Sequence, residues 1–141
     1  MFLLGLGKKN EMTLERVRKV FGKGVKLVKG AMLESFTTNI ICAVSGLYSD
    51  ELLGQATAEG LVLGNYSFTH YLSSEKQLKK NNISSVVVQL KESSSAFEKG
   101  LKVGSIIAQA TNFVKDLANE PAGVVTPAYM EEVACEIARE G

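Results

Sequence analysis

The sequence is poor in the residues on which catalytic and metal sites depend. Its 141 residues include one histidine, two cysteines and two aspartates, and no tryptophan. Cys42 and Cys135 form neither a C-x-x-C pair nor a zinc-ligand spacing, so we expect two buried, reduced thiols. His70 has no cysteine, aspartate or second histidine beside it, and we expect a surface or helix-capping residue. The nucleophile elbow G-x-S-x-G is also missing, which argues against a Ser-His-Asp hydrolase.

The carboxylates are too scattered for metal catalysis. A two-metal hydrolase site needs several carboxylates and a group that polarises the carbonyl, whereas Asp50 begins one predicted helix and Asp116 lies on another. Glu131 and Glu132 are adjacent, so on a helix they project about 100° apart. We therefore predict no catalytic, cofactor-binding or metal-ligating residue in this sequence.

Strong charge and long apolar runs are absent too. The net charge of +1 creates no field that would favour nucleic acid or an anionic membrane. Lys76, Lys79 and Lys80 form the tightest basic cluster, which we interpret as a solvated turn. The apolar run 1–6 is too short for a signal peptide or a bilayer crossing. We expect a cytoplasmic protein of one domain, or one domain and part of another.

The hydrophobic pattern of the first ninety residues alternates between strands and helices. Residues 1–6, 36–44 and 86–90 are rich in apolar or β-branched residues and are predicted strands. Helices are expected after Thr13 and after Ser49, both good N-caps. Gly5 and Gly7 do not form a dinucleotide loop, because Asn10 stands where that pattern needs glycine. Residues 73–84 are a polar connection.

The last third predicts a long helix, a stop and a new helix. We expect its buried stripe to consist of apolar residues at helical spacing: Val103, Ile107, Ala110, Val114 and Leu117. Pro121 ends this helix, and Thr126 with Pro127 starts the next. Small residues recur every four positions on two helices, giving faces for close packing: Ala56, Gly60 and Gly64, then Gly100, Gly104 and Ala108.

Strands separated by helices of this length imply parallel neighbours. The Val86–Leu90 strand is apolar but for Gln89, which indicates a sheet covered on both faces. The predicted fold is therefore an α/β three-layer sandwich, a mostly parallel sheet flanked by helices, followed by a long joining helix and one further helix.

Three segments carry a resemblance to a known family. Residues 112–127 read N-F-x-x-D-L-x-N-E-P-x-x-x-x-T-P, residues 58–71 read A-E-G-x-x-L-G-x-Y-x-F-x-x-Y, and residues 5–8 read G-L-G-K. Together they resemble the leucyl aminopeptidase (cytosol aminopeptidase) family, at the junction between its N-terminal α/β domain and its peptidase domain. The family's hallmark run Asn-Thr-Asp-Ala-Glu-Gly-Arg is not in these residues, so no catalytic role is carried over.

The resemblance implies a three-part division. Residues 1–93 would be the non-catalytic α/β domain, which either has a naturally short start or lacks its first strands, so that its sheet could have an open edge. Residues 94–120 would be the interdomain helix, and 121–141 the start of the peptidase domain, which would leave the last helix without its natural partner. The parent would be a metallo-exopeptidase with two divalent ions, zinc or manganese. Implied partners are its own peptidase domain, peptide substrates and further copies in a hexamer, with no nucleic acid or membrane.

Two alternatives stay open. The family's N-terminal domain is similar in architecture to macro domains, so the chain is also a candidate module for ADP-ribose or a nucleotide, bound at the strand ends. The second alternative is a purely structural domain that packs on partner subunits.

Overall fold

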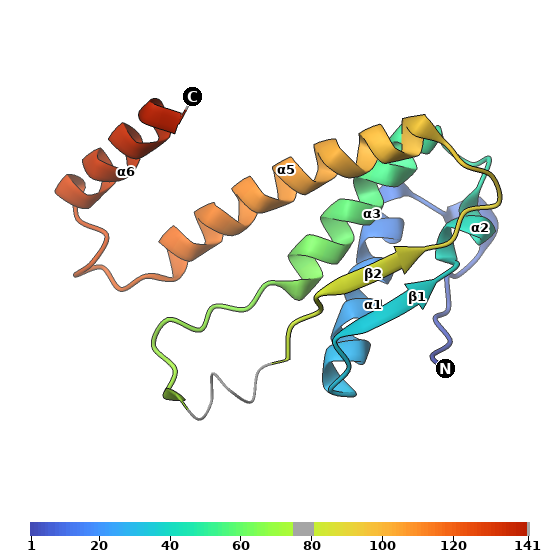
Figure 1. Cartoon of the computed structure of the whole chain (residues 1–141), viewed down its shortest axis with the longest axis horizontal. Coiled ribbons are helices and arrows are strands. Elements are labelled where there is room, and N and C mark those ends of the chain that lie inside the picture. Colours follow the sequence, from blue (N-terminus) through green and yellow to red (C-terminus); the bar gives the residue numbers. More distant parts are fainter. Residues whose placement is uncertain (75–80, 141) are drawn as a thin grey trace.

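The computed structural model describes residues 1–74 and 81–140. Figure 1 shows a cluster of helices beside a small sheet, with α5 leading away to a separate last helix. The elements in chain order are a 3₁₀ turn Lys9–Glu11, α1 Leu14–Gly30, β1 Ser35–Thr38, α2 Ile40–Val44, α3 Asp50–Asn65, β2 Ser85–Val88, α5 Ser95–Asn119 and α6 Pro127–Glu140. The lysine cluster at Lys76, Lys79 and Lys80 lies outside the described residues.

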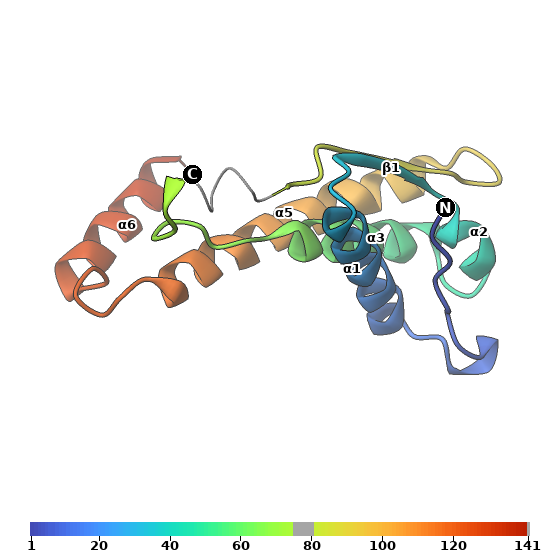
Figure 2. The ribbon, with the colours of Figure 1, turned by 90° about the horizontal axis from the view of Figure 1, so that it is seen from below.

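The sheet consists of β1 and β2, which pair in parallel with Ser35 opposite Ser85 and Thr38 opposite Val88. Figure 2 shows α1, α3 and α5 on the same side of this sheet. The α/β class, with a parallel sheet flanked by helices, is confirmed. The other sheet face is open, since Val87 is 55% exposed. The prediction of a sheet covered on both faces is therefore wrong for β2.

The predicted strand 1–6 is not a strand. Its residues are extended without ladder pairing, and Leu3 is 85% exposed. Leu4 lies against Gly24 of α1, and Leu6 packs against the core. The segment therefore runs beside a helix, where its backbone has no strand to pair with.

The second predicted strand is wrong in its last part. β1 ends at Thr38, and residues 40–44 form α2. Ile41 and Val44 of α2 are buried in the core, three positions apart on one helical face. Burial of that face outweighs the β preference of these branched side chains.

α3 is the central helix, and its small residues allow neighbours to approach on two sides. An added Cβ at Gly60 would lie 2.6 Å from the Arg18 carbonyl oxygen, and one at Gly64 would lie 2.8 Å from Gly22 Cα, both on α1. On the other side, an added Cβ at Gly54 would clash with the Phe97 carbonyl of α5. The predicted Ala56–Gly60–Gly64 track thus lies at a helix crossing.

The contact between α1 and α3 contains a buried charge. Glu59 is 6% exposed, which is unusual for a charged residue. Its carboxylate pairs with the Arg18 guanidinium and accepts a 2.7 Å hydrogen bond from Gln55 Nε2. Both carboxylate oxygens therefore have donors, as a buried charge requires.

α5 buries a different face from the predicted one. The face toward α3 is made of one aromatic and three small residues: Phe97, Gly100, Gly104 and Ala108. The predicted stripe is turned outward, with Val114 60% and Ile107 43% exposed. The small residues take the inner side because an added Cβ at Gly100 or Gly104 would clash with the backbone of Glu51 or Gln55. The predicted Gly100–Gly104–Ala108 track is thus confirmed and the predicted burial of the stripe is wrong.

The predicted helix boundaries at the junction are confirmed. α5 ends at Asn119, before Glu120 and Pro121. α6 starts at Pro127, and Thr126 Oγ1 accepts a hydrogen bond from the Tyr129 amide. In its predicted stripe, Val133 is 7% exposed and Ile137 is 56% exposed.

Candidate functional site

The last turns of α5 are tied to the loop that follows α3, which we call the Tyr66 loop (residues 66–71). The Tyr66 hydroxyl donates to Asp116 Oδ1 at 2.8 Å and accepts from Asn119 Nδ2 at 3.0 Å. Lys115 Nζ lies 3.8 Å from the centroid of the Tyr66 ring, a cation–π contact. One aromatic side chain therefore contacts three residues of α5.

A second set of contacts holds Glu120, the residue that follows the last residue of α5. Glu120 accepts a hydrogen bond from the Tyr71 hydroxyl at Oε2, and His70 Nδ1 lies 2.6 Å from its Oε1. The Glu120 side chain is 7% exposed. Both carboxylate oxygens are thus held by the Tyr66 loop, immediately before Pro121 turns the chain toward α6.

These contacts shift the ionisation of three groups. The hydrogen bond from Tyr71, and then that from His70, holds the pKa of the Glu120 carboxyl below its usual value. The hydrogen bond to Glu120 raises the pKa of the Tyr71 phenol. Burial, followed by the hydrogen bond to Asp116, raises the pKa of the Tyr66 phenol. These contacts are therefore strongest when the Glu120 carboxyl is ionised and the two phenols are protonated.

The partners in this network come from the two longest motifs found in the sequence. The residues of 58–71 and those of 112–127 are about fifty positions apart, and they meet at the C-terminal end of α5. The sequence predicted His70 as a surface residue, and its side chain is 73% exposed. Its link to Glu120 was missed, because nothing in a one-dimensional pattern pairs a loop with a distant helix end.

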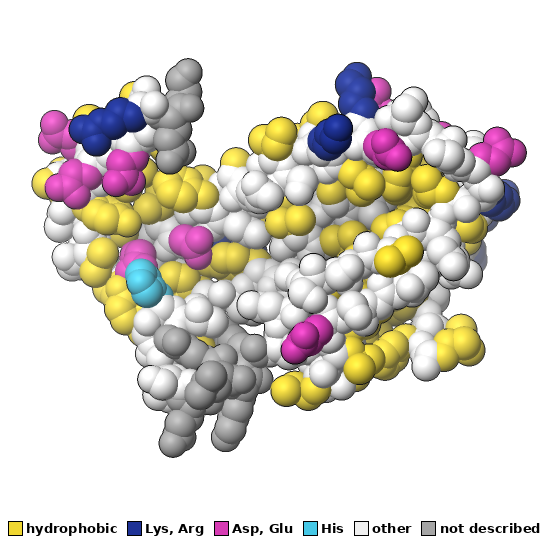
Figure 3. Space-filling view, in the orientation of Figure 1, with side chains coloured by type: hydrophobic (Ala, Val, Ile, Leu, Met, Phe, Trp, Pro, Cys, Tyr) yellow, Lys and Arg dark blue, Asp and Glu magenta, His cyan; other side chains and the backbone are white. Residues whose placement is uncertain are grey.

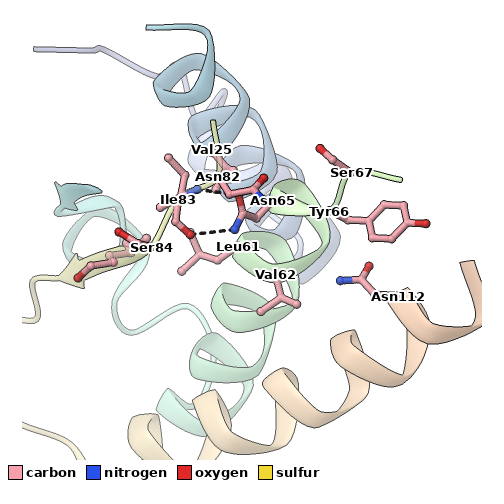
Figure 4. A pocket seen from close by; sticks show the side chains of 12 residues that line it. Val25, Leu61, Val62, Asn65, Tyr66, Ser67, Asn82, Ile83, Ser84 and Asn112 are labelled. Atoms are coloured by element: carbon pink, nitrogen blue, oxygen red, sulfur yellow. Dashed lines mark hydrogen bonds between the residues drawn. The ribbon is translucent and has the colours of Figure 1, made fainter. Parts of the chain in front are cut away.

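A pocket of about 390 Å³ lies beside the network, at the amino end of β2. Figure 4 shows two hydrogen bonds between Asn65 and Ile83. Asn65 Nδ2 donates to the Ile83 carbonyl oxygen at 2.9 Å, and the Ile83 amide donates to Asn65 Oδ1 at 3.0 Å. Lys29 Nζ donates to the Asn65 carbonyl at 2.8 Å. The buried Oδ1 atom of Asn112 has no hydrogen-bond partner among the described residues. Most polar groups here thus hold the chain together, while one acceptor stays open.

The residues that the sequence singled out elsewhere do not form a site. Asp50 is the first residue of α3 and accepts a 2.6 Å hydrogen bond from Ser94, the N-cap of α5. Cys42 is half-buried and its thiol donates to the Gln89 carbonyl, whereas Cys135 is exposed on α6. The prediction that both thiols are buried is wrong for Cys135, because the side of α6 that carries it faces solvent.

A second pocket, of about 240 Å³, lies at the carboxyl ends of the strands, where open α/β sheets bind ligands. Asp50, Ser94 and Cys42 line it, and each already has the hydrogen bond described above. This pocket therefore gives no specific support to the nucleotide-binding alternative.

The described residues do not provide a metal centre. Within residues 1–74 and 81–140, no three or more His, Cys, Asp or Glu side chains are placed to hold a metal ion. The two divalent ions implied by the resemblance therefore have no fitting ligand set in this part of the chain. Nor does any helix in the described ranges have the length and apolar character of a membrane span.

Comparisons with known proteins agree on one relationship. The pattern of the cytosol aminopeptidase family's N-terminal domain matches residues 1–75. Probable cytosol aminopeptidases of Persephonella marina and Aquifex aeolicus are 30% and 32% identical, each over 99% of this chain and over 28% and 27% of their own length. The chain thus spans about 28% of the curated relatives it matches.

A solved structure has the same fold. The bottromycin maturation enzyme BotP, in complex with Mn, superimposes with a TM-score of 0.79 at 25% sequence identity. The match covers 97% of this chain and 27% of BotP. The family resemblance inferred from the motifs is confirmed.

Proposed function

This chain belongs to the cytosol aminopeptidase family, and we propose that it forms the N-terminal, non-catalytic region of a leucyl-aminopeptidase-like metallo-exopeptidase. The parent enzyme removes N-terminal amino acids from peptides by water attack across two divalent ions, zinc or manganese. The relatives named cytosol aminopeptidases support this activity and a cytoplasmic location. BotP, solved with Mn, supports the use of metal in the parent.

In this proposal the chain has three parts. Residues 1–93 are the α/β domain, 94–120 are the interdomain helix, and 121–141 begin the peptidase domain. The metal ligands and the catalytic groups belong to the peptidase domain, because the described residues offer no ligand set. The N-terminal region serves assembly, in a hexamer of the parent, and shapes access of peptide to the active site.

The observation that carries the proposal is the hydrogen-bonded end of α5. Glu120 is held on both carboxylate oxygens, one residue before Pro121. Tyr66 holds Asp116, one turn earlier, and Asn119, the residue before Glu120. A helix end fixed at two successive turns gives the following chain a defined direction, as a domain that must position a catalytic partner requires.

Hydrolysis of a leucyl amide tests the proposal. The reading frame that carries this chain is expressed to its stop codon and compared with residues 1–141, each with added Mn²⁺ or Zn²⁺. We expect chelator-sensitive release of leucine by the complete product and none by residues 1–141. Chelator-sensitive hydrolysis by residues 1–141 alone, or an inactive complete product in both metals, contradicts it.

A further inference from the structure

One side of α5, next to the face that packs on α3, is apolar and exposed over about three turns. We call it the outer face, and it consists of Val103, Ile106, Ile107, Ala110, Phe113 and Val114. Ile106 is 68% exposed and Val114 is 60% exposed. Positions three and four apart share one side of a helix, so these residues form one continuous stripe.

The stripe lies beside the face that α5 uses within its own domain, since Val103 and Ile107 are three positions from Gly100 and Gly104. Gly100, Gly104 and Ala108 already pack on α3 and are buried. α5 is thus apolar on two sides, with small residues inward and large residues outward. A wide apolar stripe on a helix normally packs against other parts of a protein, yet here only the part made of small residues is covered.

The chain as a whole exposes more surface than its mass predicts. Its accessible area is 9322 Å², whereas a compact monomer of 15.2 kDa exposes about 7,100 Å². The excess of about 2,200 Å² exceeds the 600–1,500 Å² of ordinary interdomain interfaces. The exposed stripe is therefore part of a larger uncovered surface, and its scale suits a contact with another domain.

The exposed apolar surface continues beyond α5 along the chain. Val124 in the connection, and Met130 and Ile137 on α6, are 40%, 42% and 56% exposed. Figure 3 shows hydrophobic side chains gathered where α5 and α6 face one another. In Figure 1, α6 turns back from the end of α5 instead of continuing its line. Polypeptide attached to α6 is thus delivered next to the outer face.

We propose that the outer face of α5 is the docking surface for the peptidase domain of the same polypeptide. This inference rests on the proposed function. The curated relatives have most of their length outside the region matched here, since that region is 28% of the Persephonella marina protein. A covalently attached domain is at high effective concentration, so a contact of this size forms within one molecule.

Thiol labelling at two matched positions tests the assignment. In a Cys135→Ser background, Ile107→Cys places a thiol on the outer face and Leu27→Cys places one on α1. The native side chains are 43% and 45% exposed, so the pair is matched in accessibility. Each variant is made in residues 1–141 and in the complete reading frame, and labelled with a maleimide under native conditions. Circular dichroism checks that each variant is folded.

We expect both thiols to react at similar rates in residues 1–141. In the complete product, Ile107→Cys should react at least about tenfold more slowly, while Leu27→Cys is unchanged, because labelling of a covered site requires local opening. Equal slowing of both thiols, or of neither, overturns the proposal. A reading frame that stops at Gly141 overturns it as well.

Sedimentation and activity separate the remaining outcomes. If Ile107→Cys is already protected in residues 1–141 and that protein sediments as a dimer, a second copy covers the face and the proposal fails. Hydrolysis of a leucyl amide by the complete product is measured in parallel. An active enzyme with an unprotected Ile107→Cys refutes only the docking surface, whereas an inactive product with a protected Ile107→Cys refutes only the proposed activity.

Discussion

Tyr66 and Asp116 are fifty residues apart in the sequence and are joined by a 2.8 Å hydrogen bond between the Tyr66 hydroxyl and Asp116 Oδ1. Tyr66 follows the central helix α3, and Asp116 lies one turn before the end of α5. The bond closes the open end of the helix pair, beyond the point where their glycines pack. It ties the loop that follows α3 to the last turn of α5.

Replacing this tyrosine tests how much the link contributes to stability. Tyr66→Phe removes the bonds to Asp116 and Asn119 while keeping the ring under Lys115. We expect the free energy of unfolding in urea to fall by about 1–2 kcal/mol, since one of the two bonds has a charged acceptor. Tyr48→Phe removes a single bond to the neutral Met12 carbonyl and should cost less. A larger loss for Tyr48→Phe would contradict the prediction.

The lowered pKa of Glu120 predicts a specific dependence of stability on pH. A carboxyl whose folded pKa is lowered stabilises the fold above its ordinary pKa of 4.5, and this contribution is lost as the pH falls through the lower folded value. The Glu120→Gln variant has no carboxyl group at this position and lacks this pH-dependent contribution. Its free energy of unfolding should therefore vary less with pH in this window. Urea denaturation at several pH values below 5 measures the difference. Parallel curves for the two proteins would contradict the assigned cause.

The crossing of α3 and α5 depends on glycine at position 104. An added Cβ there would clash with the Gln55 carbonyl oxygen and lie 2.9 Å from Gln55 Cα. We expect Gly104→Ala to lower the free energy of unfolding by about 2 kcal/mol or more, because backbone must move to admit it. Gly30→Ala is the control. Nothing lies within 4 Å of an added Cβ there, and the change should stay within about 0.5 kcal/mol. Equal effects would refute the close crossing.

The two thiols should react at different rates. Cys135 is exposed on α6, whereas Cys42 is half-buried with its thiol on the Gln89 carbonyl. Titration of the native protein with a disulfide reagent should show one fast and one slow thiol, because reaction requires access. Cys135→Ser should remove the fast phase and leave the slow one. Loss of the slow phase instead would mean that Cys135 is covered in solution and contradict its assignment as the fast thiol.

Local patterns were sufficient for helix ends and for the family. Thr13, Ser49 and Thr126 were predicted as N-caps, and the side chain of each accepts a backbone hydrogen bond in the first turn. Capping depends on a few consecutive residues, so a short stretch of sequence specifies it. The same holds for Pro121, which prevents α5 from continuing.

Predictions that depended on burial were less successful. Ile40 and Ile41 favour strand locally, but the core accepts the Ile41–Val44 face as a helix. Glu59 is buried, and its partner Arg18 comes from another helix. In each case the deciding contacts come from other elements, which no local pattern contains.

By itself, the sequence determined where the helices start and stop, which positions carry no large side chain, and which family the chain belongs to. Tertiary structure alone decided that Tyr66, His70 and Tyr71 hold the end of α5, and that the helix turns its small residues inward and its large ones outward. The physical reason is that both apolar sides of α5 have helical periodicity. Only the close approach of α3, which excludes any Cβ at Gly100 and Gly104, selects the side that is buried.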